Sequence, residues 1–206
     1  MNMEEFNKIK KMNYLQYCSY LQDKYGIPKA DYMTSNWNRI KRISRANEGL
    51  QVHHLDEDKA IMLSTKEIAQ MFPFEWQTKE HLVYCDMLEH LLLHVLICYY
   101  PSPERVEQMD VGIGGAVNFL IPELNDMYCG WTTKLDWKTA QHDKVRENQD
   151  VYLAIIKKFI PYLKKRHIKK GVLFSSFNES YGLWERRKNV PIYKKINKLW
   201  GWWFLR

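Results

Sequence analysis

The chain has 206 residues, of which 46% are hydrophobic and 14% aromatic, so it can bury a sizeable core. This composition excludes disordered and collagen-like classes, and the start of the sequence carries no apolar stretch typical of a signal peptide. The longest apolar stretch, residues 91–100, covers about half of a membrane span and contains His94. The four cysteines are far apart and form no CxxC pair. We therefore expect a globular cytoplasmic protein.

The net charge of +7 is unevenly distributed along the chain. Residues 157–206 contain 14 Lys and Arg against the two acids Glu179 and Glu185, which gives +12 for this segment and leaves −5 for the first 156 residues. A basic segment joined to a mildly acidic body predicts a polyanionic partner, nucleic acid before an anionic membrane. The charge alone does not distinguish the two.

The predicted elements are mainly helical. Hydrophobic spacing predicts a helix over residues 1–25, ended by Gly26 and Pro28, and a second helix over residues 35–46. The remaining elements expected, in chain order, are a strand at 50–55, a helix at 64–71 with Ser64 as N-cap, a strand at 81–84, an apolar helix at 86–99 capped by Asp86 and Glu89, a turn at 110–116, and a long helix at 143–170 kinked or split at Pro161.

Five of the seven histidines fall within 42 residues: His53, His54, His81, His90 and His94. Two of them, His90 and His94, are four apart on a predicted helix and hence on one face, which is the usual spacing for two imidazoles on one metal ion. The neighbours His53 and His54 lie on a predicted strand and point to opposite faces. One of this pair can therefore join the metal ion while the other faces a different element of the site.

These segments resemble the HNH nuclease motif, the ββα-metal finger. The residues that carry the resemblance are Val52-His53-His54-Leu55, His81-Leu82-Val83-Tyr84 and Glu89-His90-Leu91-Leu92-Leu93-His94. They are similar to the colicin-type DNase variant, in which a His-His pair is followed by an Asn-apolar-apolar strand and a helical His-x-x-x-His. The gap from His81 to His90 matches that pattern, and the resemblance covers roughly residues 49–100, a quarter of the chain.

The resemblance implies a role for each histidine. It makes His53 and His90 metal ligands, His94 a third ligand in the colicin-type arrangement, and His54 the general base. His81 stands where the family has an Asn whose hydrogen bonds orient the loop carrying the base, and a neutral imidazole can still donate and accept. The span from His54 to His81 is longer than in compact family members.

The chemistry suits these residue types. A neutral imidazole with a pKa of about 6.5 can take the proton of a water at cellular pH, and a divalent ion can stabilise the charge on the leaving oxygen. We expect one divalent ion, Mg²⁺ or Mn²⁺ for catalysis, with Zn²⁺ or Ni²⁺ as the alternatives that imidazole ligands favour. Residues 56–58 (Asp-Glu-Asp) could add carboxylates, although such a run is more often a solvated turn.

The fold class that follows is α+β and mostly helical, with a ββα-metal finger between N-terminal helices and a basic helical C-terminal region. The regions are residues 1–48, 49–100 and 101–206, which we expect to form one compact unit. The C-terminal aromatic residues Trp200, Trp202, Trp203 and Phe204 are expected to anchor the end of the chain in the core or against a dimer partner rather than to stack on bases.

The function expected is a metal-dependent HNH endonuclease that hydrolyses phosphodiester bonds in DNA, in restriction, homing or defence. Two alternatives stay open: an RNA-cleaving HNH toxin, and a non-catalytic nucleic-acid-binding module stabilised by zinc. No membrane partner is expected, and a homodimer would pair two nicking sites. The basic residues expected to contact the phosphate backbone are Arg39, Arg42, Lys164, Lys165 and Lys169.

Overall fold

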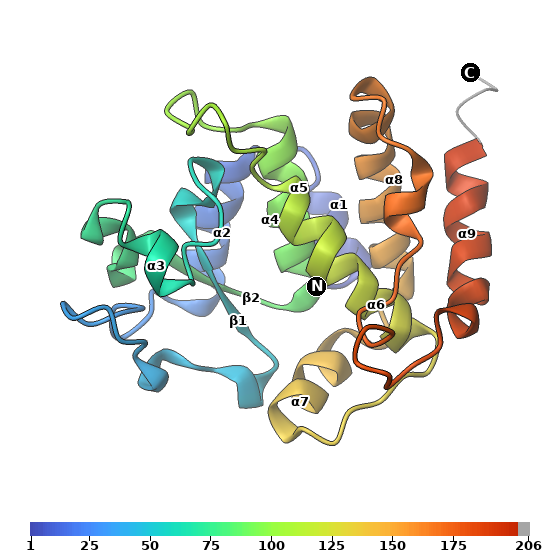
Figure 1. The fold of residues 1–206 in the computed structure, drawn as a ribbon, viewed down its shortest axis with the longest axis horizontal. Helices are drawn as coiled ribbons and strands as arrows, with labels where there is room; N and C mark the ends of the chain where they lie inside the picture. The colour runs from blue at the N-terminus through green and yellow to red at the C-terminus, as the bar shows by residue number, and fades with distance from the viewer. Residues whose placement is uncertain (202–206) are drawn as a thin grey trace.

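Residues 1–201, which the computed structural model describes, are mostly helical and contain one two-stranded antiparallel sheet (Figure 1). The strands are β1 (Gln51–His54) and β2 (Leu82–Cys85), close to the two that the sequence predicts. The expected α+β class with a helical majority is therefore confirmed. Trp202, Trp203 and Phe204 lie outside the described residues.

Helices make up most of the remaining structure. A π-helical segment, Ala116–Leu120, joins α5 to α6. The α-helices of the described residues, in chain order, are α1 (Met3–Ile9), α2 (Tyr14–Tyr25), α3 (Lys66–Ala69), α4 (Met87–Tyr99), α5 (Ile113–Gly115), α6 (Ile121–Tyr128), α7 (Asp136–Val145), α8 (Gln149–Lys165) and α9 (Val190–Gly201). No helix of the described part is long and apolar enough to cross a membrane.

The predicted cap of α4 is confirmed. The Asp86 carboxylate accepts hydrogen bonds from the backbone N–H groups of Leu88 and Glu89, and the Glu89 carboxylate accepts one from the backbone N–H of Asp86. This reciprocal capping box fixes the first residue of α4 directly after β2. The start of α4 therefore sets the positions of His90 and His94 relative to the sheet.

The single helix predicted over residues 1–25 is wrong, because Asn13 begins a new helix. Its side chain accepts from the backbone N–H of Gln16, and the Gln16 side chain accepts from the backbone N–H of Asn13, which closes a second capping box. The chain forms α1 and α2 instead.

The α-helix predicted over residues 35–46 is also wrong. A β-bridge between Met33 and Arg39 closes a loop, and Trp37 at its tip has φ +58°, a left-handed conformation that ends helical geometry. The segment that follows holds only two 3₁₀ turns, Lys41–Ile43 and Ala46–Glu48. The loop lets Tyr32, Met33 and Ile43 reach a small buried cluster with Ala69 and Leu82.

Two further helix boundaries differ from expectation. The helix predicted over residues 143–170 is not split at Pro161, which lies inside α8. It is interrupted earlier, at residues 146–148, between α7 and α8. Buried residues on both sides of Pro161 hold one continuous face of α8 against the core. The helix expected at residues 64–71 shortens to α3, preceded by Thr65 rather than capped by Ser64.

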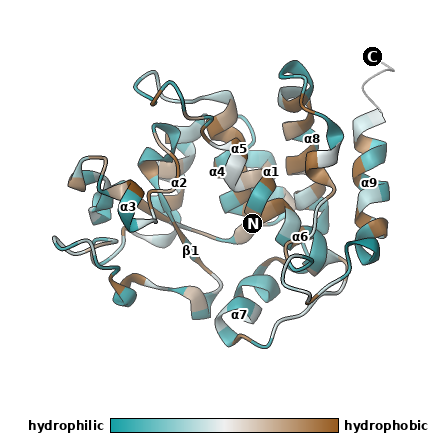
Figure 2. Ribbon diagram, viewed as in Figure 1, coloured by the Kyte–Doolittle hydropathy of each residue, from teal (hydrophilic) through white to brown (hydrophobic). Residues whose placement is uncertain are grey.

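The main hydrophobic cluster surrounds α4. It draws buried residues from α1, α2, β2, α6, α8 and α9 as well as from α4 itself, so the three regions of the sequence share one core. Figure 2 shows hydrophobic and hydrophilic residues as separate stripes on α8 and α9. In Figure 1, α8 and α9 lie to the right of α4 and α5, whereas β1 and β2 lie on the opposite, left side of α4.

Candidate metal centre

Three of the predicted histidines converge where β1 meets α4. His53 comes from β1, and His90 and His94 lie one turn apart on α4. One nitrogen atom from each of the three rings lies within 4.8 Å of the others, and the ring centroids are 4.9–5.2 Å apart. His53 and His94 are buried and His90 is half-buried. The described residues therefore contain a His53–His90–His94 cluster that could hold a metal ion.

Tyr14 determines which nitrogen of His53 faces the cluster. The Tyr14 hydroxyl donates to the carbonyl oxygen of Leu55 at 2.9 Å, so its oxygen accepts from Nε2–H of His53, also at 2.9 Å. Nδ1 of His53 then carries the lone pair, and this buried atom has no hydrogen-bond partner among the described residues. A buried nitrogen of this kind, with the opposite ring nitrogen held by a hydrogen bond, is the arrangement of a metal-binding histidine.

Gln51 determines which nitrogen of His90 carries the lone pair. Its side-chain oxygen accepts from Nδ1–H of His90 at 2.6 Å, which leaves Nε2 of His90 with the lone pair. The Gln51 amide in turn donates to the side-chain oxygen of Gln141 on α7 at 3.2 Å. The hydrogen bonds thus fix both the tautomer and the orientation of His90.

Two glycines allow α5 to approach His94. A Cβ atom on Gly115 would lie 2.6 Å from Nδ1 of His94, and Gly112, with φ +83°, lies so close that its Cβ would meet the His94 carbonyl oxygen at 2.7 Å. The segment that the sequence predicts as a turn at residues 110–116 is a turn only to Gly112, and helix follows from Ile113. The glycines let α5 and its preceding turn cover the His94 side of the cluster.

His54 points away from the cluster, as its place on the strand predicts. Its Nε2 lies 3.3 Å from the side-chain oxygen of Gln77, whose own amide donates to the Leu63 carbonyl oxygen at 3.2 Å. The ring also contacts Tyr32 edge-on at 4.5 Å between centroids, and the Arg39 guanidinium lies 5.1 Å above the Tyr32 ring. His54 is 1% exposed beneath these residues.

His81 lies just before β2 and is connected to the turn after His54. Its Nδ1–H donates to the Asp56 carboxylate at 2.6 Å, and its Nε2 is 3.5 Å from the Glu75 carboxylate. Asp56 also pairs with Lys59 at 3.0 Å. His81 therefore links the residue before β2 to the turn that follows β1 through this hydrogen bond.

Glu57, in the same turn, faces the cluster although residues 56–58 read as a solvated turn in the sequence. One carboxylate oxygen lies 3.5 Å from Nδ1 of His53 and 3.6 Å from Nε2 of His94, and the other lies 3.8 Å from Nδ1 of His54. Glu57 is half-buried, and its neighbours Asp56 and Asp58 are buried. The expectation of a solvated turn is wrong for this segment.

Burial keeps the clustered imidazoles neutral. It lowers the pKa of His53 to about 3 and holds the pKa values of His90 and His94 below their usual value near 6.5. Neutral rings offer the lone pairs that a metal ion requires.

Acid is expected to destabilise the metal-free protein below about pH 6.5. In that range the unfolded chain binds protons at these histidines and the folded chain does not, so the free energy of unfolding falls by at most about 1.4 kcal/mol per pH unit for each histidine. Urea unfolding of chelator-treated protein at pH 7.5, 6.5, 5.5 and 5.0 measures the slope. A flat stability over this range would contradict the neutral cluster.

The Gly115→Ala substitution is expected to displace His94. The added methyl group cannot fit beside the buried ring, so either α5 or the imidazole must shift. We expect a loss of about 1–3 kcal/mol of stability together with weaker metal binding. Urea unfolding and metal titration measure both effects, and Gly171→Ala, where a methyl group meets nothing within 4 Å, is the matched control.

The predicted phosphate contacts lie in two places. Arg39 and Arg42 are both exposed, and Arg39 lies over Tyr32, whose ring contacts His54. Lys165 and Lys169 are exposed at the end of α8 and just after it, and α8 and the sheet lie on opposite sides of α4 (Figure 1). Lys164 donates to the Trp200 carbonyl oxygen at 2.8 Å and lies over the Trp200 ring, so it joins α8 to α9.

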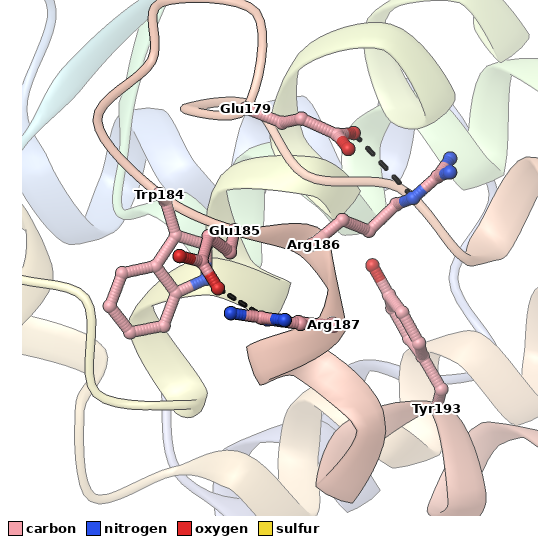
Figure 3. Close-up of a pocket in the computed structure, with 6 residues that line it drawn as sticks. All are labelled: Glu179, Trp184, Glu185, Arg186, Arg187 and Tyr193. Atoms are coloured by element: carbon pink, nitrogen blue, oxygen red, sulfur yellow. Dashed lines mark hydrogen bonds and ion pairs between the residues drawn. The ribbon is translucent and has the colours of Figure 1, made fainter.

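A separate hollow of about 480 Å³ opens near the start of α9 (Figure 3). Its arginines are already paired, Arg186 with Glu179 at 3.5 Å and Arg187 with Glu185. The hollow contains none of the clustered histidines, and its lining residues are Glu179, Trp184, Glu185, Arg186, Arg187 and Tyr193. It does not contribute to the metal centre.

Comparisons with protein-family models, curated proteins and solved structures find no match to this chain.

Proposed function

We propose that the chain is a metal-dependent HNH-type endonuclease that hydrolyses phosphodiester bonds in DNA. The observation that carries the proposal is the convergence of His53, His90 and His94, with His54 on the opposite face of the same strand. The order β1, β2, α4, with His53 and His54 on β1 and His90 and His94 on α4, supports the proposal because the resemblance to the ββα-metal finger predicts that order. Tyr14 and Gln51, which fix the tautomers of two of the histidines, support the metal-binding part.

His53, His90 and His94 would hold one divalent ion through Nδ1, Nε2 and a His94 ring nitrogen. When bound, the ion would stabilise negative charge on the leaving oxygen of a phosphodiester. We propose Mg²⁺ or Mn²⁺ for catalysis, with Zn²⁺ or Ni²⁺ also suited to imidazole donors. The unpartnered buried Nδ1 of His53 is the feature that best fits a bound cation.

His54 is the proposed general base. Because Gln77 offers a fixed side-chain oxygen to Nε2–H of His54, the lone pair resides on Nδ1, which can accept a proton from the attacking water. The proposed role of His81 is to position this base, through its hydrogen bond to Asp56 in the adjoining turn. Since His54 lies beneath Tyr32, the Tyr32–Arg39 layer must shift when substrate binds, and Arg39 would then meet a phosphate group.

A nicking assay tests the proposal. Chelator-treated protein is incubated with supercoiled plasmid, linear duplex DNA and structured RNA, each with Mg²⁺, Mn²⁺, Ni²⁺ or Zn²⁺. We expect metal-dependent nicking of plasmid with little RNA cleavage. Faster RNA cleavage would replace DNA by RNA as the substrate, and no cleavage of any substrate with any of the four ions would contradict the enzyme.

Burial of the cluster favours one second candidate, a non-catalytic nucleic-acid-binding module stabilised by zinc. His53 is fully buried and His94 is 7% exposed, as in structural sites that exclude solvent. This candidate requires stoichiometric zinc in the purified protein and unfolding on chelation. Circular dichroism before and after chelation distinguishes the two, since the endonuclease is expected to keep most of its helical signal without metal.

A further inference from the structure

Glu57 is placed at the metal centre by the turn that follows β1. The 3₁₀ turn Leu55–Asp58 directs the side chain of Glu57 back toward His53, four residues earlier. The Asp56 carboxylate binds His81 and Lys59, and within residues 1–201 the carboxylate that pairs with both His53 and His94 is that of Glu57. Glu57 is therefore the acid of this turn that faces the histidines, with a side chain 17% exposed.

The distances from Glu57 to two of the three clustered imidazoles, His53 and His94, are those of donors that share an ion. The carboxylate lies 3.5 Å from Nδ1 of His53 and 3.6 Å from Nε2 of His94, and Nδ1 of His53 makes no hydrogen bond to it. Two donors bound tetrahedrally to one zinc ion at about 2.0–2.2 Å are roughly 3.4 Å apart. The observed separations are close to that value.

A simple ion pair with a protonated His53 does not account for this arrangement. Nε2–H of His53 already donates to Tyr14, and Nδ1 makes no hydrogen bond to the carboxylate 3.5 Å away, so Nδ1 presents a lone pair toward it. A lone pair and a half-buried carboxylate at this distance repel each other, and a cation shared by the two would remove the repulsion. Within residues 1–201, the ion-pair partners of Glu57 are histidines, with no Lys or Arg among them.

We propose that Glu57 is the fourth protein donor to the divalent ion of the His53–His90–His94 cluster, which makes the site a His₃Glu centre. The inference rests on the metal-binding part of the proposed function and is independent of cleavage. A carboxylate adds a hard oxygen donor to three imidazoles, so the site would accept Mn²⁺ as well as Zn²⁺. The negative charge of the carboxylate would also offset one of the two positive charges of the ion beside the buried His53.

Metal affinity of Glu57 variants tests this inference. Zn²⁺ and Mn²⁺ affinities of the full chain are measured by competition with a chromophoric chelator for wild type, Glu57→Gln and Glu57→Asp. We expect Glu57→Gln to bind Zn²⁺ at least about 10-fold more weakly than wild type, and Glu57→Asp, which keeps the charge but shortens the side chain, to fall between them. The control is Glu67→Gln, the same change at an exposed position of α3, which should bind as wild type does.

The outcomes separate this inference from the proposed function. If wild type and Glu57→Gln bind Zn²⁺ equally, Glu57 is not a donor, while the histidine site and the nuclease proposal stand. If wild type binds neither ion, both the site and this inference fail. If Glu57→Gln and Glu67→Gln lose affinity equally, the effect is one of general charge and overturns the inference.

Discussion

The His90→Ala variant is expected to bind Zn²⁺ at least about 100-fold more weakly than wild type. Structural zinc sites gain about 10–16 kcal/mol from roughly four donors, so removal of one donor costs about 3 kcal/mol, or two orders of magnitude. His90 suits this test because it is the half-buried member of the cluster, so its replacement disturbs the core least. Chelator competition at pH 7.5 measures the affinity, and elemental analysis measures the stoichiometry.

Two further variants provide reference values for the loss of Zn²⁺ affinity in His90→Ala. His167→Ala removes an exposed histidine outside the cluster and should leave Zn²⁺ affinity unchanged. Tyr14→Phe removes the hydroxyl that accepts from Nε2–H of His53 and donates to the Leu55 carbonyl oxygen but leaves the three histidines in place, and we expect a smaller loss of about 10-fold. A His90→Ala protein that binds Zn²⁺ as tightly as His167→Ala would show that the three histidines do not share an ion.

The histidine cluster could be predicted from the sequence because its geometry is local. A separation of four residues on an apolar helix places His90 and His94 on one face whatever surrounds them, and alternation along a strand separates His53 from His54. The capping box of Asp86 and Glu89 is also a local signal, and it fixes where α4 begins. The convergence of β1 with α4 followed from the order of these elements.

The residues that support the cluster could not be predicted, since they come from distant parts of the chain. Tyr14 is 39 residues from His53, and Gln141 is 90 residues from Gln51. Gly115 looks like a turn residue in the sequence, and its role depends on a side chain of another helix. Tertiary contacts also override the helical pattern of residues 35–46, because burial of Tyr32, Met33 and Ile43 in the small cluster favours a loop closed by the Met33–Arg39 bridge.

The fold separates the basic residues of the C-terminal region from the proposed cutting centre. The basic residues near the end of α8 and the sheet lie on opposite sides of α4, whereas Arg39 lies over Tyr32, which contacts His54. Under the proposed function, a bound nucleic acid must therefore meet Arg39 first at the cutting centre. Lys165 and Lys169 would hold only a substrate long enough to extend around the molecule, which makes substrate length a useful variable in the nicking assay.

The His54→Ala variant is expected to nick plasmid DNA about 10²–10⁴-fold more slowly than wild type while it keeps its Zn²⁺ affinity. Loss of a general base removes that much rate, and His54 does not belong to the group of nitrogens that converge among the described residues. The rate is measured under single-turnover conditions with saturating metal ion at pH 7.5, so that binding of metal ion and product release do not limit it.

His142→Ala is the matched control for the cavity that His54→Ala creates. His142 is as deeply buried as His54, but it bonds to Glu123 at 2.8 Å between α6 and α7 and belongs to no part of the proposed centre. If the loss of folding stability alone lowers the nicking rate, the two variants should nick plasmid equally slowly at a temperature where both are folded. A slow His54→Ala beside a near-normal His142→Ala supports the base, and equal nicking by His54→Ala and wild type would assign the proton transfer to another group.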